Sequence, residues 1–293
     1  MALRSRGFKL IAVNKFRSIF QARQFSTHGE NKHDDQKSSQ THFGFETVDE
    51  QEKWKKVHEV FETVAGTYDV MNDAMSLGIH RLWKDIFMQR LGPTHGTDLL
   101  DVAGGTGDIS FRYLKYLQNR PTGPGVRSSS VTVCDINQAM LDVGQLRAKR
   151  LQVPEQCRLS WVCGDAESLP LPSESYSAYT IAFGIRNCTH IDKVLSEAYR
   201  VLRPGGRFLC LEFGQLPSPA LQWLYDQYSF QVVPALGQLV AGQWRPYRYL
   251  VESIRQFPDQ ESFKCMISEA GFRQVRYENL TLGVCAIHSG YKL

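Results

Sequence analysis

The chain has 293 residues, of which 42% are hydrophobic, with 34 basic residues against 30 acidic ones. This composition excludes a natively disordered chain and suffices for the core of one large α/β domain or two small ones. No run of about 18 uninterrupted apolar residues is present, so we expect no membrane-spanning helix.

The first 25 residues differ in charge from the rest of the chain. They include basic residues and no aspartate or glutamate, and their apolar residues recur at roughly helical spacing. Such a segment is typical of a mitochondrial presequence, so we expect a targeting segment over residues 1–25 and a polar linker over residues 26–43. A basic arm that binds nucleic acid is less favoured, because the apolar residues are interleaved with the basic ones.

Seven cysteines are scattered along the chain, mostly within apolar runs. None has the C-x-x-C spacing of a zinc site, and their odd number does not suit a complete set of disulfides. We therefore expect reduced core cysteines and no metal.

From Thr97 onward, short apolar runs alternate with longer amphipathic ones. Strands are predicted over residues 97–105, 130–135, 157–165, 177–184, 206–213, 272–281 and 284–293. Helices are predicted over residues 108–118, 137–150, 190–202 and 259–271. Apolar strands separated by helices indicate a mainly parallel sheet covered on both faces. The last two strands are joined only by Leu282 and Gly283, which predicts a hairpin and one antiparallel strand.

Residues 216–258 fall outside this alternation and form an aromatic-rich segment that we expect to be a helical insertion. An aromatic insertion beside the carboxyl edge of the sheet is either a substrate lid or a packing element. Composition alone slightly favours packing.

Acidic residues and glycines occur where the predicted strands end. Asp101 ends the first strand, Asp135 ends the second, and Asp165 with Ala166 ends the third; the turn after the first strand contains Gly104, Gly105, Thr106 and Gly107. Each acid alone would more often be a helix cap or turn residue. Their joint position at one edge of a sheet favours a ligand site, with glycines that let the backbone approach the ligand.

The spacing of the glycines restricts the ligand. The segment from Gly105 to Ser110 lacks the third glycine of the dinucleotide fingerprint, which disfavours a nicotinamide-dependent reductase. A carboxylate at the end of the second strand suits a ribose diol, because it accepts two hydrogen bonds.

This arrangement resembles the class I S-adenosylmethionine-dependent methyltransferases. The resemblance implies a Rossmann-like α/β fold with a seven-stranded sheet and S-adenosyl-L-methionine as cofactor. It also implies that the glycine turn faces the amino-acid part of the cofactor, that Asp101 holds its ammonium through water, that Asp135 binds the ribose, and that Asp165 and the Ala166 amide bind the adenine.

Two stretches, YDVMNDAMSLGIHRLWK at residues 68–84 and RVLRPGGRFLCLEF at residues 200–213, closely resemble the signature motifs of the ubiquinone/menaquinone biosynthesis C-methyltransferase family. The resemblance extends over residues 44–293. The family's cofactor contacts then fall on Thr106, Asp135, Asp165 and Ala166. Bacterial members have a serine contact where this chain has Ala182, and the loss of one hydroxyl should cost about 1 kcal/mol.

The resemblance implies C-methylation of a polyprenyl methoxy-benzoquinol, whose hydroxyl must lose a proton. Arg186 and Asn187 follow the fourth strand, so we expect Arg186 to stabilise the phenolate or activate a water and Asn187 to orient the ring oxygens. Alternatively, Arg186 pairs with a structural carboxylate such as Glu212. His80 is the second candidate base, because an imidazole titrates near neutrality.

The stretch at residues 67–84 mixes hydrogen-bonding and apolar side chains. Alone it could be an amphipathic helix with a polar face. Placed before the sheet, it predicts an N-terminal helical cap over residues 44–96, in which Tyr68, Asn72, Asp73 and His80 are candidates to face the quinol.

The resemblance also implies a mitochondrial matrix enzyme that lies peripherally on the inner membrane, within a multi-subunit ubiquinone biosynthetic complex and with a second copy of itself as a further partner. A non-catalytic scaffold that retains the fold is the alternative. Intact Thr106, Asp135 and Asp165 argue against it.

Overall fold

The computed structural model describes residues 40–64, 68–121, 125–151, 153 and 156–293. The predicted targeting segment and residues 26–39 of the predicted linker lie outside these residues. None of the helices described is both long enough and apolar enough to span a membrane.

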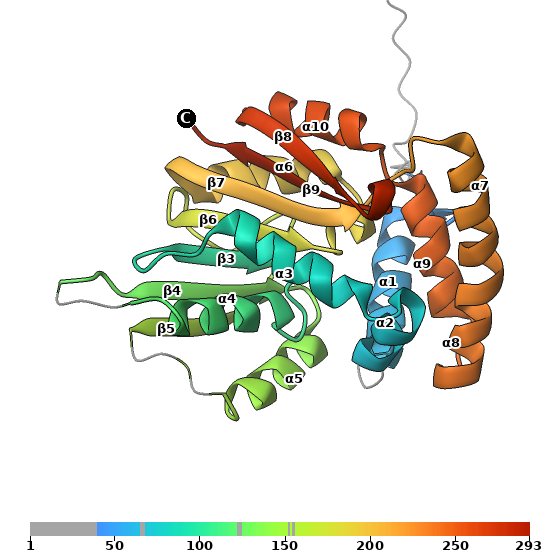
Figure 1. Cartoon of the computed structure of the whole chain (residues 1–293), viewed down its shortest axis with the longest axis horizontal. Coiled ribbons are helices and arrows are strands. Elements are labelled where there is room, and N and C mark those ends of the chain that lie inside the picture. Colours follow the sequence, from blue (N-terminus) through green and yellow to red (C-terminus); the bar gives the residue numbers. More distant parts are fainter. Residues whose placement is uncertain (1–39, 65–67, 122–124, 152, 154–155) are drawn as a thin grey trace, which may run out of the picture. The chain divides into compact units, whose positions relative to one another are not determined.

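The central sheet has seven strands in the order β5-β4-β3-β6-β7-β9-β8 (Figure 1). Their bounds are β3 Asp98–Val102, β4 Ser129–Asp135, β5 Cys157–Cys163, β6 Tyr176–Ala182, β7 Leu202–Phe213, β8 Arg273–Leu280 and β9 Cys285–Tyr291. Only β9 runs antiparallel to its neighbours, β7 and β8. The predicted mainly parallel sheet with one antiparallel strand is therefore confirmed.

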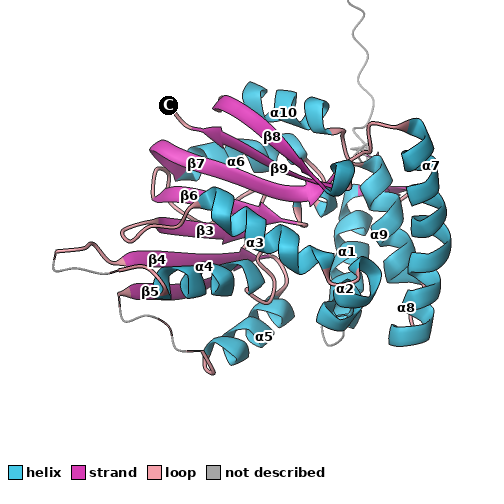
Figure 2. Ribbon diagram, viewed as in Figure 1, coloured by secondary structure: helices cyan, strands magenta, loops and turns pink. Residues whose placement is uncertain are grey.

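Helices cover both faces of the sheet (Figure 2). Their bounds are α3 Ile79–Leu91, α4 Asp108–Gln118, α5 Gln138–Ala148, α6 Ile191–Val201 and α10 Gln260–Glu269. Successive residues of β3 face opposite sides, because side chains alternate along a strand. Leu99 packs with Phe87 of α3 and Tyr113 of α4, whereas Leu100 packs in a separate core with Leu195 of α6.

Strand β7 begins earlier than the predicted start at residue 206. Leu202 pairs with Tyr176, and the register then shifts so that Arg207 pairs with Ala178. The residues between, including Gly205 at a φ of 81°, form an irregular stretch within the strand. The predicted helix therefore ends at Val201 and not at Leu202.

The N-terminal cap begins with a hairpin, β1 Gln40–Phe43 and β2 Glu46–Asp49, followed by α1 Glu50–Val64 and α2 Tyr68–Ser76. The prediction was wrong in two respects: residues 40–43 are a strand and not linker, and the cap is not wholly helical. The hairpin is held by its aromatic residue, since the Phe43 ring stacks on Tyr249 with centroids 4.1 Å apart.

The insertion at residues 216–258 is helical, as predicted. It contains α7 Pro219–Gln227, a π-helical turn Tyr228–Val232, α8 Val233–Ala241 and α9 Arg245–Gln256. Met71 of α2 packs with Val233, Tyr247 and Val251 of the insertion. Helix α2 and the insertion thus share a small core, and α1, α2 and the insertion gather at one end of the sheet, whereas α3 lies over one face of the sheet (Figures 1 and 2).

Candidate active site

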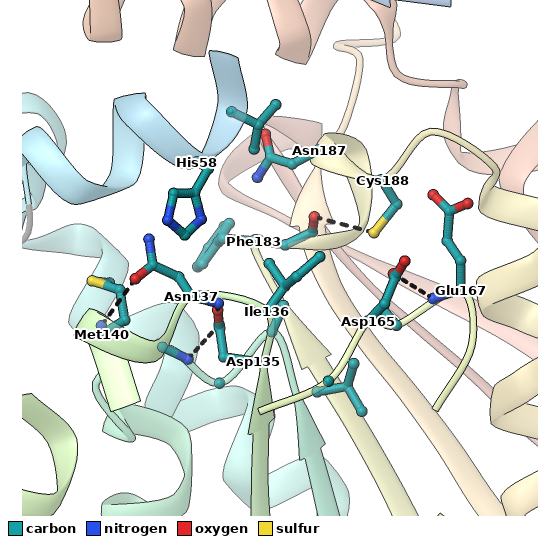
Figure 3. Close-up of a pocket in the computed structure, with 18 of the residues that line it drawn as sticks. His58, Asp135, Ile136, Asn137, Met140, Asp165, Glu167, Phe183, Asn187 and Cys188 are labelled. Carbon is teal, nitrogen blue, oxygen red and sulfur yellow. Dashed lines mark hydrogen bonds between the residues drawn. The ribbon is translucent and has the colours of Figure 1, made fainter. Parts of the chain in front are cut away.

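The carboxyl ends of the parallel strands line a cavity of about 580 Å³, which we call the first cavity. It brings together most of the predicted cofactor residues, namely Asp101, Gly104, Gly105, Thr106, Asp135, Asp165 and Ala166. Figure 3 shows side chains from α1, from the end of β4 and from the segments after β5 and β6 converging on it. The residues are neighbours because parallel strands end at the same edge of the sheet.

Gly104 and Gly107 have different roles in the turn after β3. A Cβ on Gly104 would lie 2.6 Å from Cγ1 of Val133, so only glycine fits at this position in the first cavity. Gly107 does not line the first cavity. It has a φ of 85° at the start of α4, and a Cβ there would lie 2.8 Å from the Trp161 ring. Gly107 therefore shapes the turn and does not face the cavity.

Asp101 is buried and accepts hydrogen bonds from the Ser110 hydroxyl at 2.7 Å and the Thr180 hydroxyl at 3.0 Å. Burial raises its pKa to about 7, against the opposing effect of these two hydrogen bonds. A cationic group in the cavity would therefore stabilise the ionised carboxylate.

Asp135 accepts backbone hydrogen bonds from Gly105 and Asn137, both at 2.8 Å. Burial raises its pKa. Since each carboxylate oxygen has a further lone pair, Asp135 can still accept bonds from a ribose diol. Above it, His58 of α1 faces the cavity (Figure 3). His58 Nδ1 and Asn137 Nδ2 are buried without a hydrogen-bond partner among the described residues, which fits a polar ligand between them.

Thr106 and Asp165 also have protein partners. The Thr106 hydroxyl accepts from Arg147 at 2.9 Å, and Asp165 accepts from the Glu167 backbone at 2.9 Å. Ala182, in place of the bacterial serine, lines the first cavity as expected for that position. The donor and acceptor set therefore fits S-adenosyl-L-methionine, with Asp135 beside the glycine turn and Asp165 after β5.

A second cavity of about 300 Å³ lies between the cap, the insertion and the sheet. It is largely aromatic and aliphatic, with side chains that include Met71, Met75, Phe213, Tyr225, Tyr228, Tyr247 and Tyr249. Phe183 and Lys84 line both cavities. Phe183 has a φ of 58°, a strained conformation for a non-glycine residue that is often found at functional sites.

Arg186 lines the second cavity and is paired with Glu212 at 2.9 Å, the alternative that the sequence left open. The same Nη1 also donates to the Phe183 carbonyl. Its Nε is buried without a hydrogen-bond partner among the described residues. The two bonds occupy Nη1 alone, so Nε is among the donors that Arg186 keeps for a ligand.

Asn187 lines the first cavity, and its side-chain oxygen accepts from the Tyr249 hydroxyl at 3.1 Å. Tyr249 lines the second cavity. Burial raises the pKa of Tyr249, so its hydroxyl stays protonated at neutral pH. No sequence pattern singled out Tyr249 beyond its place in an aromatic-rich segment.

The candidate residues of the cap separate into three groups. Asn72 and His80 line the second cavity, and the His80 ring bonds the Ser76 hydroxyl at 2.8 Å. Asp73 lines neither cavity; its carboxylate is held by Arg81 at 2.7 and 2.6 Å. The side chain of Tyr68 lies outside the described residues, so its prediction stays open.

Helix α1 supplies cavity residues that no sequence motif indicated. Trp54 and His58 line the first cavity, and Lys53 donates to the Cys188 carbonyl at 3.0 Å. His190 lies between Glu167 and Glu50 of α1, at 2.7 and 3.1 Å. These contacts, which link residues far apart in the sequence, hold α1 over the strand ends.

The strand order, the single antiparallel strand and the glycine turn beside an acid at the end of the neighbouring strand define a class I S-adenosylmethionine-dependent methyltransferase. A solved S-adenosylmethionine-dependent methyltransferase from Thermotoga maritima has a TM-score of 0.51 and 17% identity over 80% of this chain and 99% of its own. This likeness concerns the fold.

The model of the ubiE/COQ5 methyltransferase family matches residues 47–292, and the chain belongs to this family. Two curated relatives carry the name 2-methoxy-6-polyprenyl-1,4-benzoquinol methylase, mitochondrial. The Drosophila melanogaster protein is 69% identical and the Homo sapiens protein 54% identical, each match covering 88% of this chain and 86% of the relative. The resemblance, the methyltransferase activity and the cofactor S-adenosyl-L-methionine are thereby confirmed.

Proposed function

We propose that this methyltransferase transfers a methyl group to a ring carbon of a 2-methoxy-6-polyprenyl-1,4-benzoquinol in ubiquinone biosynthesis. The observation that carries the proposal is the apolar second cavity, which meets the cofactor cavity at Phe183 and Lys84. A ring in this cavity lies next to the cofactor site, as methyl transfer requires. The names of the relatives support the choice of ring.

The bound cofactor supplies an electrophilic methyl group. The ring carbon becomes nucleophilic when a neighbouring hydroxyl, with an ordinary pKa of about 10, gives up its proton. Arg186 is suited to stabilise the resulting phenolate through its free Nε–H. Asn187 lines the first cavity and is held by Tyr249 of the second, so it orients a ring oxygen where the two cavities meet.

His80 remains the second candidate base. Burial and the positive charge of Lys84 lower the pKa of His80, so its imidazole is neutral at pH 7 and able to accept a proton. Trp83, Phe183 and Phe213 pack against one another beside the cavity and exclude water from it.

The second cavity is small for a ligand with a polyprenyl tail. Its volume of about 300 Å³ lies at the lower end of the range for small-molecule sites. The polyprenyl tail therefore extends beyond the second cavity. The insertion at residues 216–258 acts as a lid that covers the tail. Large apolar side chains are exposed nearby, at Leu77, Trp223, Leu224 and Leu239.

This exposed surface supports a peripheral position on the matrix side of the mitochondrial inner membrane, because the substrate tail is itself a membrane component. The relatives are named as mitochondrial proteins. An exposed apolar surface of this kind also suits contacts with other subunits of a biosynthetic complex, or with a second copy of this chain in a homodimer. The non-catalytic scaffold is disfavoured, since Thr106, Asp135 and Asp165 line an open cavity that fits the cofactor.

A turnover assay with a short-tailed demethyl quinol and methyl-labelled cofactor tests the proposed reaction. We expect the label on a ring carbon. Label on oxygen would overturn the reaction assignment, and calorimetry without binding heat for the cofactor would instead favour the scaffold.

A further inference from the structure

Lys84 of α3 is a buried cation at the junction of the two cavities. Its side chain is only 9% exposed, and Nζ donates to Oδ2 of Asp108 at 2.6 Å. An ammonium carries three N–H donors. The other two have no hydrogen-bond partner among the residues that the structure describes. A buried charge is costly unless its donors are satisfied, so the two remaining donors point to a ligand.

The pairing with Asp108 places this ammonium at one end of the first cavity. Asp108 is the first residue of α4 and directly follows the glycine turn, Gly104 to Gly107. Although burial opposes it, the neighbouring charges of Lys84 and Arg112 hold the pKa of Asp108 below its ordinary value. The N-terminal end of a helix also favours an anion. Asp108 is therefore ionised and satisfies one donor of Lys84, whereas the other donors of Lys84 and the helix N-terminus suit a negatively charged group of the ligand beside the turn.

The charges that line the first cavity are mostly negative. The acidic side chains are Glu50, Asp101, Asp108, Asp135, Asp165 and Glu167. Of the lysines, Lys53 donates to the Cys188 carbonyl after β6, and Lys55 is exposed. Among the described residues, Lys84 is therefore the buried lysine next to the glycine turn. An anionic group of the ligand has its best partner there.

S-adenosyl-L-methionine has one such group, the α-carboxylate of its amino-acid end, which faces the glycine turn in the expected orientation. We infer that Lys84 is a cofactor-binding residue whose ammonium donates to this carboxylate, and that Asp108 positions the ammonium. Asp101 and Lys84 then bind the two opposite charges of the amino-acid end. The inference concerns the cofactor, and it holds whichever ring is methylated.

The test compares S-adenosyl-L-methionine with its decarboxylated analogue, which keeps the sulfonium and the amino group. Calorimetric affinities are measured for the wild type and for Lys84→Met. A lost charge-assisted hydrogen bond should weaken binding of the intact cofactor by about 10- to 100-fold. Binding of the analogue should change by less than about threefold, because it has no carboxylate to lose.

Two further variants serve as controls. Lys115→Met removes an exposed lysine from α4 and should leave both affinities unchanged. Lys84→Arg keeps the charge and should recover part of the affinity for the intact cofactor, because a planar guanidinium does not reproduce the geometry of a compact buried ammonium. The fold should tolerate the loss of Lys84, since Arg112 still pairs with Asp108 at 3.1 Å. If Lys84→Met is nevertheless unfolded, Lys84→Gln, which keeps a donor for Asp108, replaces it.

The inference is wrong if Lys84→Met, or Lys84→Gln in its place, weakens both ligands equally or neither. Equal loss would mean that Lys84 only shapes the cavity. If neither affinity falls but turnover is reduced and recovers at high pH, the ammonium of Lys84 instead interacts with the quinol oxygen. These outcomes are distinguishable from a failure of the proposed reaction, which would leave the cofactor affinities as predicted.

Discussion

Arg186 and Glu212 form a buried ion pair beside the second cavity, with side chains that are 5% and 1% exposed. Burial raises the pKa of Glu212, and the neighbouring Arg186 opposes this shift. Glu212 also accepts a hydrogen bond, at 2.9 Å, from the backbone N–H of the next residue, Phe213. The carboxylate therefore fixes the guanidinium, while Nε stays available.

Arg186→Met should lower kcat by about 100-fold, because a phenolate loses its cationic partner. It should also destabilise the fold by about 3 kcal/mol, since Glu212 is left buried and unpaired. The double variant Arg186→Met/Glu212→Gln separates the two effects. Its melting temperature should recover towards that of the wild type, whereas kcat should stay low. Recovery of turnover in the double variant would show that Arg186 has only a structural role. Arg245→Met, which removes an exposed arginine from the start of α9, is the control.

Asp101 should make the stability of the free protein depend on pH. Its pKa is about 7 in the fold and near 3.8 in an unfolded chain, so the folded state binds more protons between these values. Stability should therefore fall as pH rises from about 4 to about 7. Asp101→Asn cannot ionise and should lack this component. The melting temperature of the variant relative to the wild type should increase from pH 5 to pH 8. If the difference in melting temperature between variant and wild type stays constant across this range, the pKa of Asp101 is not raised in the fold.

Cofactor binding should be linked to the same group. An ammonium near Asp101 favours its ionised form, so binding at pH 6 should release a proton from the carboxyl. Calorimetry in buffers of different ionisation enthalpy measures this release. The release should be absent in Asp101→Asn, and equal release in the variant would assign the proton to another group.

His80→Gln should retain turnover within about fivefold of the wild type if the imidazole is structural, since glutamine can also bond the Ser76 hydroxyl. A loss of more than about 100-fold, without a change in cofactor affinity, would instead identify His80 as the base.

Gly237→Ala tests the insertion as a lid. A Cβ at this position of α8 would lie 2.0 Å from Cδ2 of Tyr247 in α9, so the two helices must separate. We expect a higher KM for the quinol and an unchanged cofactor affinity. Gly104→Ala should show the reverse, because its Cβ would lie 2.6 Å from Val133 inside the first cavity. Equal effects of both substitutions on both ligands would mean that the cavities do not function separately.

The sequence alone determined the sheet and most of the residues that line the first cavity. The strands are apolar on both faces, and residues such as Asp135 and Asp165 lie directly at the strand ends, so their convergence follows from the parallel arrangement. The glycine turn is similarly local. The wrong boundary at the start of β7 lies where Leu202 pairs with Tyr176 of β6. Residues 40–43 pair with the adjacent β2, and the long-range contact of this hairpin is the stacking of Phe43 on Tyr249.

Only the tertiary structure decided which side chains contact one another and which cavity each of them lines. Glu50 and His190 are 140 positions apart, and their contact brings α1 over the first cavity. Asp73 is held by Arg81, Gly107 faces Trp161, and Lys84 lies between two cavities, none of which a local pattern specifies. Periodicity fixes which face of an element is apolar, whereas the partner of a polar group depends on which elements pack together.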